Sequence, residues 1–146
     1  MKNKASKLKL AIRPFEKKDE HNLILLWKEC GLVVPQNDPA QDIEAKLQVQ
    51  PELFLVGELD LKIVGSIMGG YDGHRGWINY LAVATNFQRK GIARQLIEIL
   101  EKKLLAMGCQ KINLQVRSKN ISVIEFYKRT GFKKDDVVSL GKRIIP

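Results

Sequence analysis

The sequence predicts a single-domain α/β (α+β) protein in which a mixed sheet is flanked by helices. Three observations support this fold class. The length of 146 residues is typical of one domain. Short segments between residues 53 and 83 are rich in apolar residues and bounded by turn residues, as strands are. Amphipathic helical patterns stand before and after these segments, so helices can cover the sheet.

The N-terminal part of the chain predicts a strand followed by a helix. Residues 8–15, LKLAIRPF, alternate between apolar and polar positions. Asp19 is a candidate N-cap for a helix that runs to Cys30, and Gly31 is suited to end it. One face of this helix carries the apolar side chains Leu23, Leu26 and Trp27.

A second helix and a hairpin are predicted next. Residues 37–48, NDPAQDIEAKLQ, form a helix in which Asp38 is the cap and Pro39 occupies the first helical position. Residues 53–60, LFLVGELD, and 62–70, KIVGSIMGG, read as two strands joined by a short turn.

The second half of the chain predicts a strand, a long helix and further short elements. Residues 71–76, YDGHRG, have turn chemistry, and residues 77–83, WINYLAV, form the next strand. Residues 111–116 predict a strand, 122–131 a short helix, and 132–145 the last one or two strands. Between them, apolar residues at helical spacing predict the long helix: Ile92, Leu96, Ile99, Leu100 and Leu104.

Composition and charge narrow the class of protein. No apolar run approaches the roughly 20 residues of a membrane-spanning helix, so we expect no membrane partner. Residues 1–7 are basic but precede no secretory core, which predicts a flexible N-terminus on a cytoplasmic protein. The net charge of +9 fits either attraction to a polyanion or a solvated lysine-rich surface. No nucleic-acid-binding motif is present, so we favour a phosphorylated cofactor over nucleic acid.

The two cysteines predict neither a metal site nor a nucleophile. Cys30 and Cys109 belong to no CxxC or Cys/His cluster, so we expect reduced thiols and no metal. Cys30 lies near a helix end, where the helix dipole disfavours a thiolate, and Cys109 has no histidine partner nearby in the sequence.

The segment NFQRKGIAR, residues 86–94, carries the strongest functional signal. It places cations and Gly91 where the long helix begins. Free backbone N–H groups and the positive end of the helix dipole suit such a position for a phosphate-rich ligand. The alternative is an ordinary strand-to-helix turn with solvated cations. The segment is neither a Walker A loop nor a GxGxxG motif.

The order of segments resembles the GNAT superfamily of N-acetyltransferases. Gln88, Gly91 and Ala93 match its pyrophosphate motif, Q/R-x-x-G-x-G/A. The later segment NISVIEFYKRTGF, residues 120–132, matches the family's Asn, Tyr and Gly-Phe positions. The segments NDP, LFLV and MGGYDGHRG resemble its YpeA-type bacterial branch. The resemblance implies one domain over residues 1–146, with six to seven mostly antiparallel strands, about four helices and a splayed pair of central strands.

The resemblance also implies acetyl-CoA as cosubstrate and places it on named residues. Backbone groups of the strand at 81–83 would pair with the pantetheine arm, as an added strand would. The loop and helix start at 88–94 would bind the pyrophosphate. The implied cofactor-binding residues are Leu81, Ala82, Val83, Gln88, Arg89, Lys90, Gly91, Ile92, Ala93, Arg94, Asn120 and Tyr127.

The implied chemistry is direct acetyl transfer to a primary amine, with Tyr127 as the general acid. A phenol with a pKa of ~10 is protonated at neutral pH and can donate to the departing thiolate. The alternative is a core aromatic residue. The strand at 77–83 lacks the glutamate that several family members use as a base. Candidates in its place are Asn79, through a water, and His74, although the segment DGHRG also reads as a plain turn; Glu29 and Glu44 are further carboxylates that could reach an acceptor.

Two other functions stay open at this point. A non-catalytic acyl-CoA-binding regulatory module would keep the pyrophosphate motif and need no base, and a basic nucleic-acid-binding protein would bind with a steep salt dependence. For the enzyme, the acceptor could be a protein N-terminus, a lysine or a small-molecule amine. The family forms monomers or homodimers, and no residue pattern decides between them.

Overall fold

A computed structural model describes residues 9–146, so the predicted flexible segment 1–7 lies outside the described residues. Backbone contacts divide the chain into two compact units, the first ending at Leu114 and the second running from Gln115 to Pro146.

The first unit contains one five-stranded sheet in the order β1-β2-β3-β4-β5. Its first four strands pair in antiparallel fashion, and β5 pairs parallel to β4. The predicted mixed, mostly antiparallel sheet is therefore confirmed. The strands are β1 (Ala11–Pro14), β2 (Phe54–Leu59), β3 (Lys62–Tyr71), β4 (Gly76–Val83) and β5 (Ile112–Asn113).

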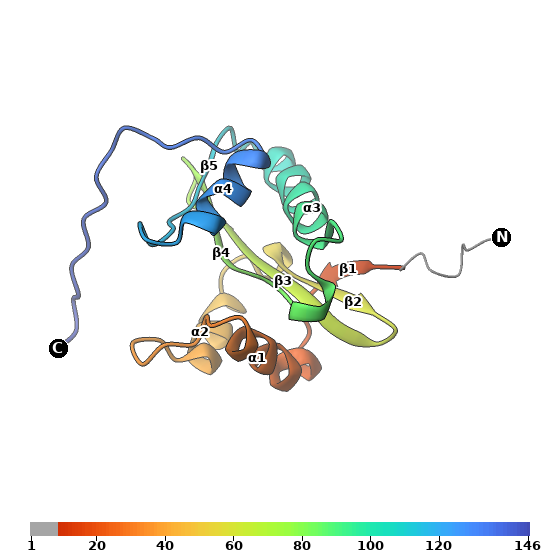
Figure 1. The fold of residues 1–146 in the computed structure, drawn as a ribbon. Helices are drawn as coiled ribbons and strands as arrows, with labels where there is room; N and C mark the ends of the chain where they lie inside the picture. The colour runs from red at the N-terminus through yellow and green to blue at the C-terminus, as the bar shows by residue number, and fades with distance from the viewer. Residues whose placement is uncertain (1–8) are drawn as a thin grey trace. The chain divides into compact units, whose positions relative to one another are not determined.

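Helices cover both faces of this sheet, with α1 and α2 on one face and α3 on the other (Figure 1). The α-helices are α1 (Glu20–Glu29), α2 (Pro39–Lys46) and α3 (Ile92–Ala106). Three short 3-10 turns lie between elements: η2 (Lys17–Asp19), η3 (Pro51–Leu53) and η4 (Thr85–Phe87). With α4 (Ile121–Arg129) of the second unit, the described chain has the four predicted α-helices. None of its helices is both long and apolar enough to cross a membrane.

The two faces of the sheet have separate cores. On the α1–α2 face, Trp27 and Phe54 are completely buried and stack with ring centroids 6.2 Å apart. On the α3 face, Leu96 and Leu100 pack against glycines of the sheet. A Cβ at Gly69 would lie 2.3 Å from Leu100 Cδ1, so the absence of a side chain there lets α3 sit close to β3.

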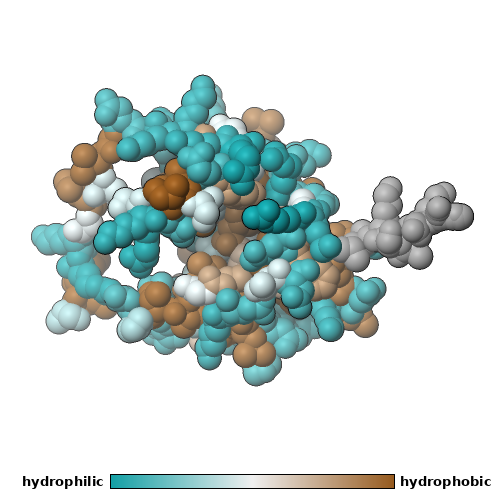
Figure 2. Space-filling model, viewed as in Figure 1, coloured by the Kyte–Doolittle hydropathy of each residue, from teal (hydrophilic) through white to brown (hydrophobic). Residues whose placement is uncertain are grey.

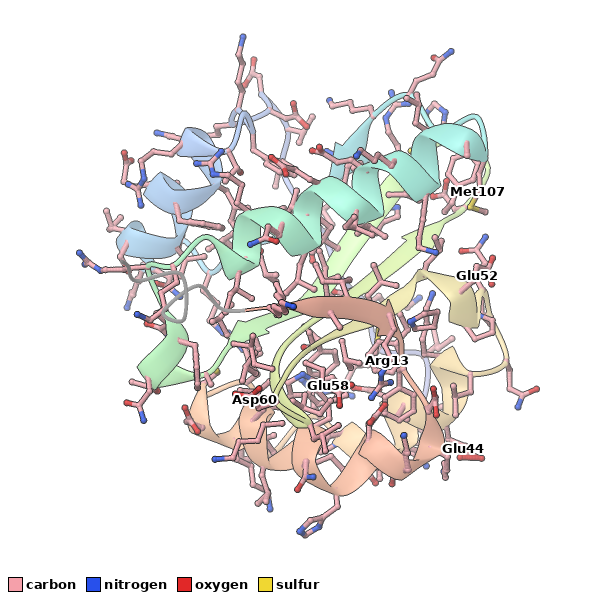
Figure 3. The ribbon with its side chains drawn as sticks, turned by 90° about the vertical axis from the view of Figure 1, so that its right-hand side faces the viewer. Arg13, Glu44, Glu52, Glu58, Asp60 and Met107 are labelled. Carbon is pink, nitrogen blue, oxygen red and sulfur yellow. The ribbon has the colours of Figure 1, made fainter. Side chains whose placement is uncertain are left out.

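Of the two N-cap residues predicted from the sequence, one caps its helix and the other does not. Asp38 caps α2 by accepting from the Gln41 N–H at 3.2 Å, as predicted. Asp19 stands before α1, but no side-chain cap bond forms there. Its carboxylate instead accepts from both terminal nitrogens of Arg13. Arg13 also pairs with Glu58 on β2, and Figure 3 shows these two side chains next to each other.

The predicted strands at 132–145 are wrong, and so is the count of six to seven strands. Within residues 115–146 the structure has one helix and no strand. The segment opens with charged residues at 133–136, and its apolar side chains do not alternate regularly with polar ones. Without a neighbouring strand to pair with, these apolar side chains stay exposed: Val137, Val138, Leu140, Ile144 and Ile145.

Polar side chains cover most of the face shown in Figure 2, and apolar side chains form small scattered groups on it. This distribution is typical of a folded surface, and it means that a ligand site has to be sought in backbone geometry and in specific side-chain pairs.

Candidate active site

One edge of β4 is left without a neighbouring strand over most of its length. β4 and β5 pair at two positions, Gly76 with Ile112 and Trp77 with Asn113, and the pairing ends there. From residue 78 onward, the backbone groups that face this side have no strand partner within residues 9–114. This is the place where the family resemblance implies that two central strands splay apart.

The pairing with β3 shows which backbone groups face the free edge. Ala82 lies opposite Ser66, and the Ala84 N–H donates to the Val64 carbonyl at 2.8 Å. Because hydrogen-bonded positions alternate along an antiparallel ladder, Ala82 turns its backbone groups toward β3. Leu81 and Val83 turn theirs toward the free edge. Of the three residues expected to be unpaired, these two therefore remain.

The Val83 carbonyl already has partners in the protein. It accepts from Gln88 Nε2 at 3.1 Å and from the Cys30 thiol at 3.3 Å. Gln88, the first residue of the predicted motif, thus ties the loop to the end of β4. The backbone groups that can still pair with an added strand are the N–H and carbonyl of Leu81 and the N–H of Val83.

A bulge in β4 lies within this free edge. Asn79 lies opposite Met68 and Ala82 opposite Ser66, so β4 has one extra residue between them. Tyr80 adopts a φ of +51°, which a non-glycine residue rarely does. Such a conformation persists only where surrounding contacts hold it.

Three contacts hold Tyr80 in this conformation. Its ring stacks on Trp27 with centroids 3.8 Å apart, and its hydroxyl donates to Asp42 Oδ2 at 2.6 Å. Its carbonyl accepts from Ser66 Oγ at 2.8 Å, and Ser66 in turn accepts from Trp27 Nε1 at 2.9 Å. Burial and the neighbouring Asp42 raise the pKa of Tyr80 above its ordinary value. Sequence reasoning missed this network; its one signal was Ser66, a polar residue inside an apolar strand.

The predicted pyrophosphate loop connects η4 to α3. Gly91 stands at the N-cap of α3 with a φ of +84°, and no side chain caps the helix there. A Cβ at Gly91 would meet no described protein atom within 4 Å, so the space in front of it is open. The next residue, Ile92, is buried and anchors the helix start in the α3 core. The first N–H groups of α3 therefore face an open region with the positive end of the helix dipole.

The cations of the loop are exposed and unpaired. Arg89, Lys90 and Arg94 are all exposed, and none takes part in an ion pair within the described chain. Arg89 has a φ of +62°, which makes the loop turn sharply just before Gly91. The first turn of α3 contains no acidic residue, so the local charge is positive.

His74 and its neighbours form the turn between β3 and β4. The backbone N–H groups of His74 and Arg75 both donate to Asp72 Oδ1 at 2.7 Å. These bonds and that of Trp77 Nε1 to Asp72 Oδ2 hold the pKa of Asp72 down to about 2. His74 is exposed at the far end of β4, seven residues and roughly 20 Å along the strand from Leu81. The turn interpretation of DGHRG accounts for all of these contacts.

The other acidic candidates, Glu29 and Glu44, already have partners in the protein. Glu29 Oε2 accepts from the Thr85 N–H at 2.7 Å, which lowers the pKa of Glu29 and caps η4. Glu44 pairs with Lys17 on the surface. Asn79, by contrast, is exposed on β4 immediately before the bulge. Over residues 9–146, no group of three or more His, Cys, Asp or Glu side chains is arranged to hold a metal ion.

Asn120 and Tyr127 belong to the second unit. Asn120 is the N-cap residue of α4, and its side chain makes no cap hydrogen bond. The Tyr127 ring lies edge-on to Phe126 and Phe132, with centroids 5.3 and 5.4 Å away. Burial raises the pKa of the Tyr127 hydroxyl to about 12, so this group stays protonated at neutral pH. Tyr127 therefore has both the aromatic packing of a core residue and the protonated hydroxyl that a general acid requires.

Comparison with known proteins decides the family. The model of the Acetyltransferase (GNAT) family matches residues 20–132. The chain belongs to the GNAT family. Relatives of this GNAT chain include a protein named as an acetyltransferase in Yersinia enterocolitica, which is 51% identical over 136 residues, or 93% of this chain and 96% of the relative. An acetyltransferase of Pectobacterium atrosepticum is also 51% identical over 136 residues, with the same coverage.

Solved structures share the fold of this GNAT acetyltransferase. The aminoglycoside N-acetyltransferase AAC(6')-Iy, in complex with CoA, has a TM-score of 0.78 at 17% identity and covers 95% of this chain and 97% of its own. Ard1 from Thermoplasma volcanium has a TM-score of 0.72 at 25% identity, covering 85% of this chain and 82% of its own. The protein is an N-acetyltransferase, and acetyl-CoA is its cosubstrate.

Proposed function

We propose that the enzyme transfers an acetyl group from acetyl-CoA directly to a primary amine, without an acyl-enzyme intermediate. One observation carries this proposal: the loop that leads into the uncapped start of α3 is hydrogen-bonded, through Gln88, to Val83 on the free edge of β4. A helix start binds phosphate, and a free strand edge binds an extended amide chain. A coenzyme with a pyrophosphate and an amide-containing arm fits both.

Different residues of the first unit would bind different parts of the cosubstrate. Backbone N–H groups at Ile92, Ala93 and Arg94 would hold the pyrophosphate, and the open space at Gly91 would let it approach closely. The Val83 N–H would pair with an amide of the pantetheine arm. The side chains of Arg89, Lys90 and Arg94 would add charge near the phosphates. In the second unit, Asn120 would contact the cofactor arm.

The transfer step needs a proton donor, a polarised carbonyl and a neutral amine. The amine nitrogen forms a bond to the thioester carbon, the carbon–sulfur bond breaks, and the sulfur leaves as a thiolate. Tyr127 would donate its proton to that thiolate, because its hydroxyl is protonated at neutral pH. The Leu81 N–H, which faces the free edge on the side of Val83 away from the pyrophosphate loop, would polarise the carbonyl as a single-donor oxyanion site.

Deprotonation of the amine would proceed through a water held by Asn79. No carboxylate stands on β4, and Glu29 is committed to η4. His74 is not part of the proposed mechanism because it lies in the turn at the other end of the strand. Water is a weak base, so the proposal favours an α-amine, with a pKa of ~7.7–8.0, over a lysine at ~10.4.

The test combines cosubstrate binding with turnover in wild type and Tyr127→Phe. Acetyl-CoA should stabilise both proteins against unfolding, by about 2.7 kcal/mol at one hundred times its dissociation constant, whereas ATP should not. Turnover by Tyr127→Phe should fall at least ~100-fold, the effect expected from losing a general acid. Unchanged turnover would remove Tyr127 from the mechanism. Binding without turnover for any amine in the wild type would support the non-catalytic alternative.

A further inference from the structure

Helix α2 presents two opposite charges toward the sheet. Asp42 and Lys46 are one helical turn apart, so they lie on the same face of the helix. Both side chains are half-buried. Asp42 reaches Tyr80 on β4, and Lys46 Nζ lies 3.8 Å from the position of a Cβ on Gly70 of β3.

These two charges do not pair with each other. An acidic residue four positions before a lysine normally forms an ion pair along a helix. Here Asp42 is bonded to the Tyr80 hydroxyl, and no ion pair of the described residues includes Lys46. Burial lowers the pKa of Lys46, an effect that nearby Glu52 partly offsets. A half-buried ammonium without a hydrogen-bonded anion costs free energy, so the fold tolerates an unfavourable group here.

The strand register places this lysine two residues along β4 from Asn79, the residue proposed to hold the activating water. Gly70 lies opposite Trp77, and Met68 lies opposite Asn79. At about 3.3 Å per residue, the level of Lys46 is roughly 7 Å along β4 from Asn79. Tyr80, the next residue, begins the bulge of β4. A molecule that extends from Asn79 away from the cosubstrate would reach Lys46.

We propose that the acceptor is a zwitterionic amine whose amino group lies at the Asp42–Tyr80 pair and whose carboxylate binds Lys46. The separation of one helical turn suits a compact amino acid or the end of a short peptide. Asp42 attracts the arriving ammonium, and its remaining carboxylate oxygen can orient the nitrogen. Lys46 supplies the anion site that α2 leaves unfilled. This proposal rests on the proposed function, because it assigns the acceptor of that same transfer step.

The test uses pairs of acceptors that differ in one carboxylate. L-alanine and L-alaninamide form one pair, and 4-aminobutyrate and its amide form another. For each pair, the preference is the kcat/KM for the carboxylate member divided by the kcat/KM for its amide. This preference should be at least ~10-fold larger in the wild type than in Lys46→Met. Comparing these ratios cancels the intrinsic difference in amine reactivity. Lys46→Arg should keep most of the preference, and Lys102→Met, which removes an exposed lysine of α3, should leave it unchanged.

Two further measurements separate this proposal from its alternatives. Acetyl-CoA should stabilise Lys46→Met as much as the wild type, because Lys46 is not placed at the cosubstrate. Equal preferences in wild type and Lys46→Met would overturn the zwitterion proposal, and so would acetylation of the amides alone or of neither member. Loss of acetyl-CoA stabilisation in the wild type would instead overturn the proposed function. Lys46→Met should itself be no less stable than wild type, since it removes an unpaired half-buried charge.

Discussion

At Asp19, burial and hydrogen bonding act in opposite directions on one carboxylate. The residue is 5% exposed, and this burial by itself raises the pKa. Arg13 donates to both carboxylate oxygens, at 2.8 and 2.9 Å, and the Glu16 N–H donates at 2.8 Å. Together these bonds prevail and lower the pKa of Asp19 below its ordinary value. The carboxylate thereby links β1 to the start of α1.

Asp19→Asn should destabilise the protein at pH 7 by about 2 kcal/mol, the contribution of hydrogen bonds to a charged group. The folded-state pKa lies below the unfolded value of about 3.9, so the stabilisation is present above that pH and is lost as pH falls through the folded pKa. Urea unfolding of both proteins at pH 7 and near pH 3 measures the difference, which should shrink at the lower pH. Asp60→Asn, at an exposed turn residue, is the control and should change little. A pH-independent difference would contradict the charge-based account.

At the scale of the element, α3 has a glycine at each end with a similar backbone conformation. Gly91 precedes the helix with a φ of +84°, and Gly108 follows it with a φ of +94°. An added Cβ would meet no described atom within 4 Å at either site. The two ends therefore differ in electrostatics, with free N–H groups at one and free carbonyls at the other.

Gly91→Ala and Gly108→Ala should each lower the free energy of unfolding by about 1 kcal/mol, because both force alanine into a left-handed conformation. Their effects on the cosubstrate should differ. Gly91→Ala should weaken acetyl-CoA binding at least ~10-fold, since its methyl group occupies the open space at the helix start, whereas Gly108→Ala should not weaken it. Isothermal titration calorimetry measures both. Equal affinities would show that the cosubstrate does not lie at this end of α3.

At the scale of the whole molecule, a net charge of +9 attracts any polyanion. The local cations Arg89, Lys90 and Arg94 add to this general attraction at the proposed pyrophosphate site. Screening by salt weakens interactions between exposed charges over distances beyond about 8 Å at physiological ionic strength. The general and the local contributions can therefore be separated by comparing variants of equal net charge.

Changing Arg89, Lys90 and Arg94 together to glutamine should weaken acetyl-CoA binding and flatten its dependence on salt, because three charges near the phosphates are lost. The control replaces Lys28, Lys102 and Lys103 by glutamine, which gives the same net charge away from the loop. It should leave the affinity within about threefold of the wild type. Binding isotherms from 50 to 500 mM NaCl provide the measurement. Equal losses in both variants would mean that only overall charge matters.

Local patterns in the sequence were enough to predict most of the framework, and the family resemblance supplied the proposed position of the cosubstrate. Helical spacing predicts α3, and turn residues predict the β2–β3 hairpin. The physical reason is that these features depend on residues a few positions apart. Asp72 likewise forms the turn that its own segment indicates.

Only the tertiary structure decided the remaining features. Asp42 and Tyr80 are 38 residues apart, and their bond exists because α2 packs over a bulge in β4. The bulge depends on the register with β3, which no local pattern records. Similarly, the apolar residues after 132 could form strands only with a neighbour to pair with, and the structure pairs them with none among the described strands. Contacts between distant residues form when elements pack together, so the residues of the proposed acceptor site are brought together only in the fold.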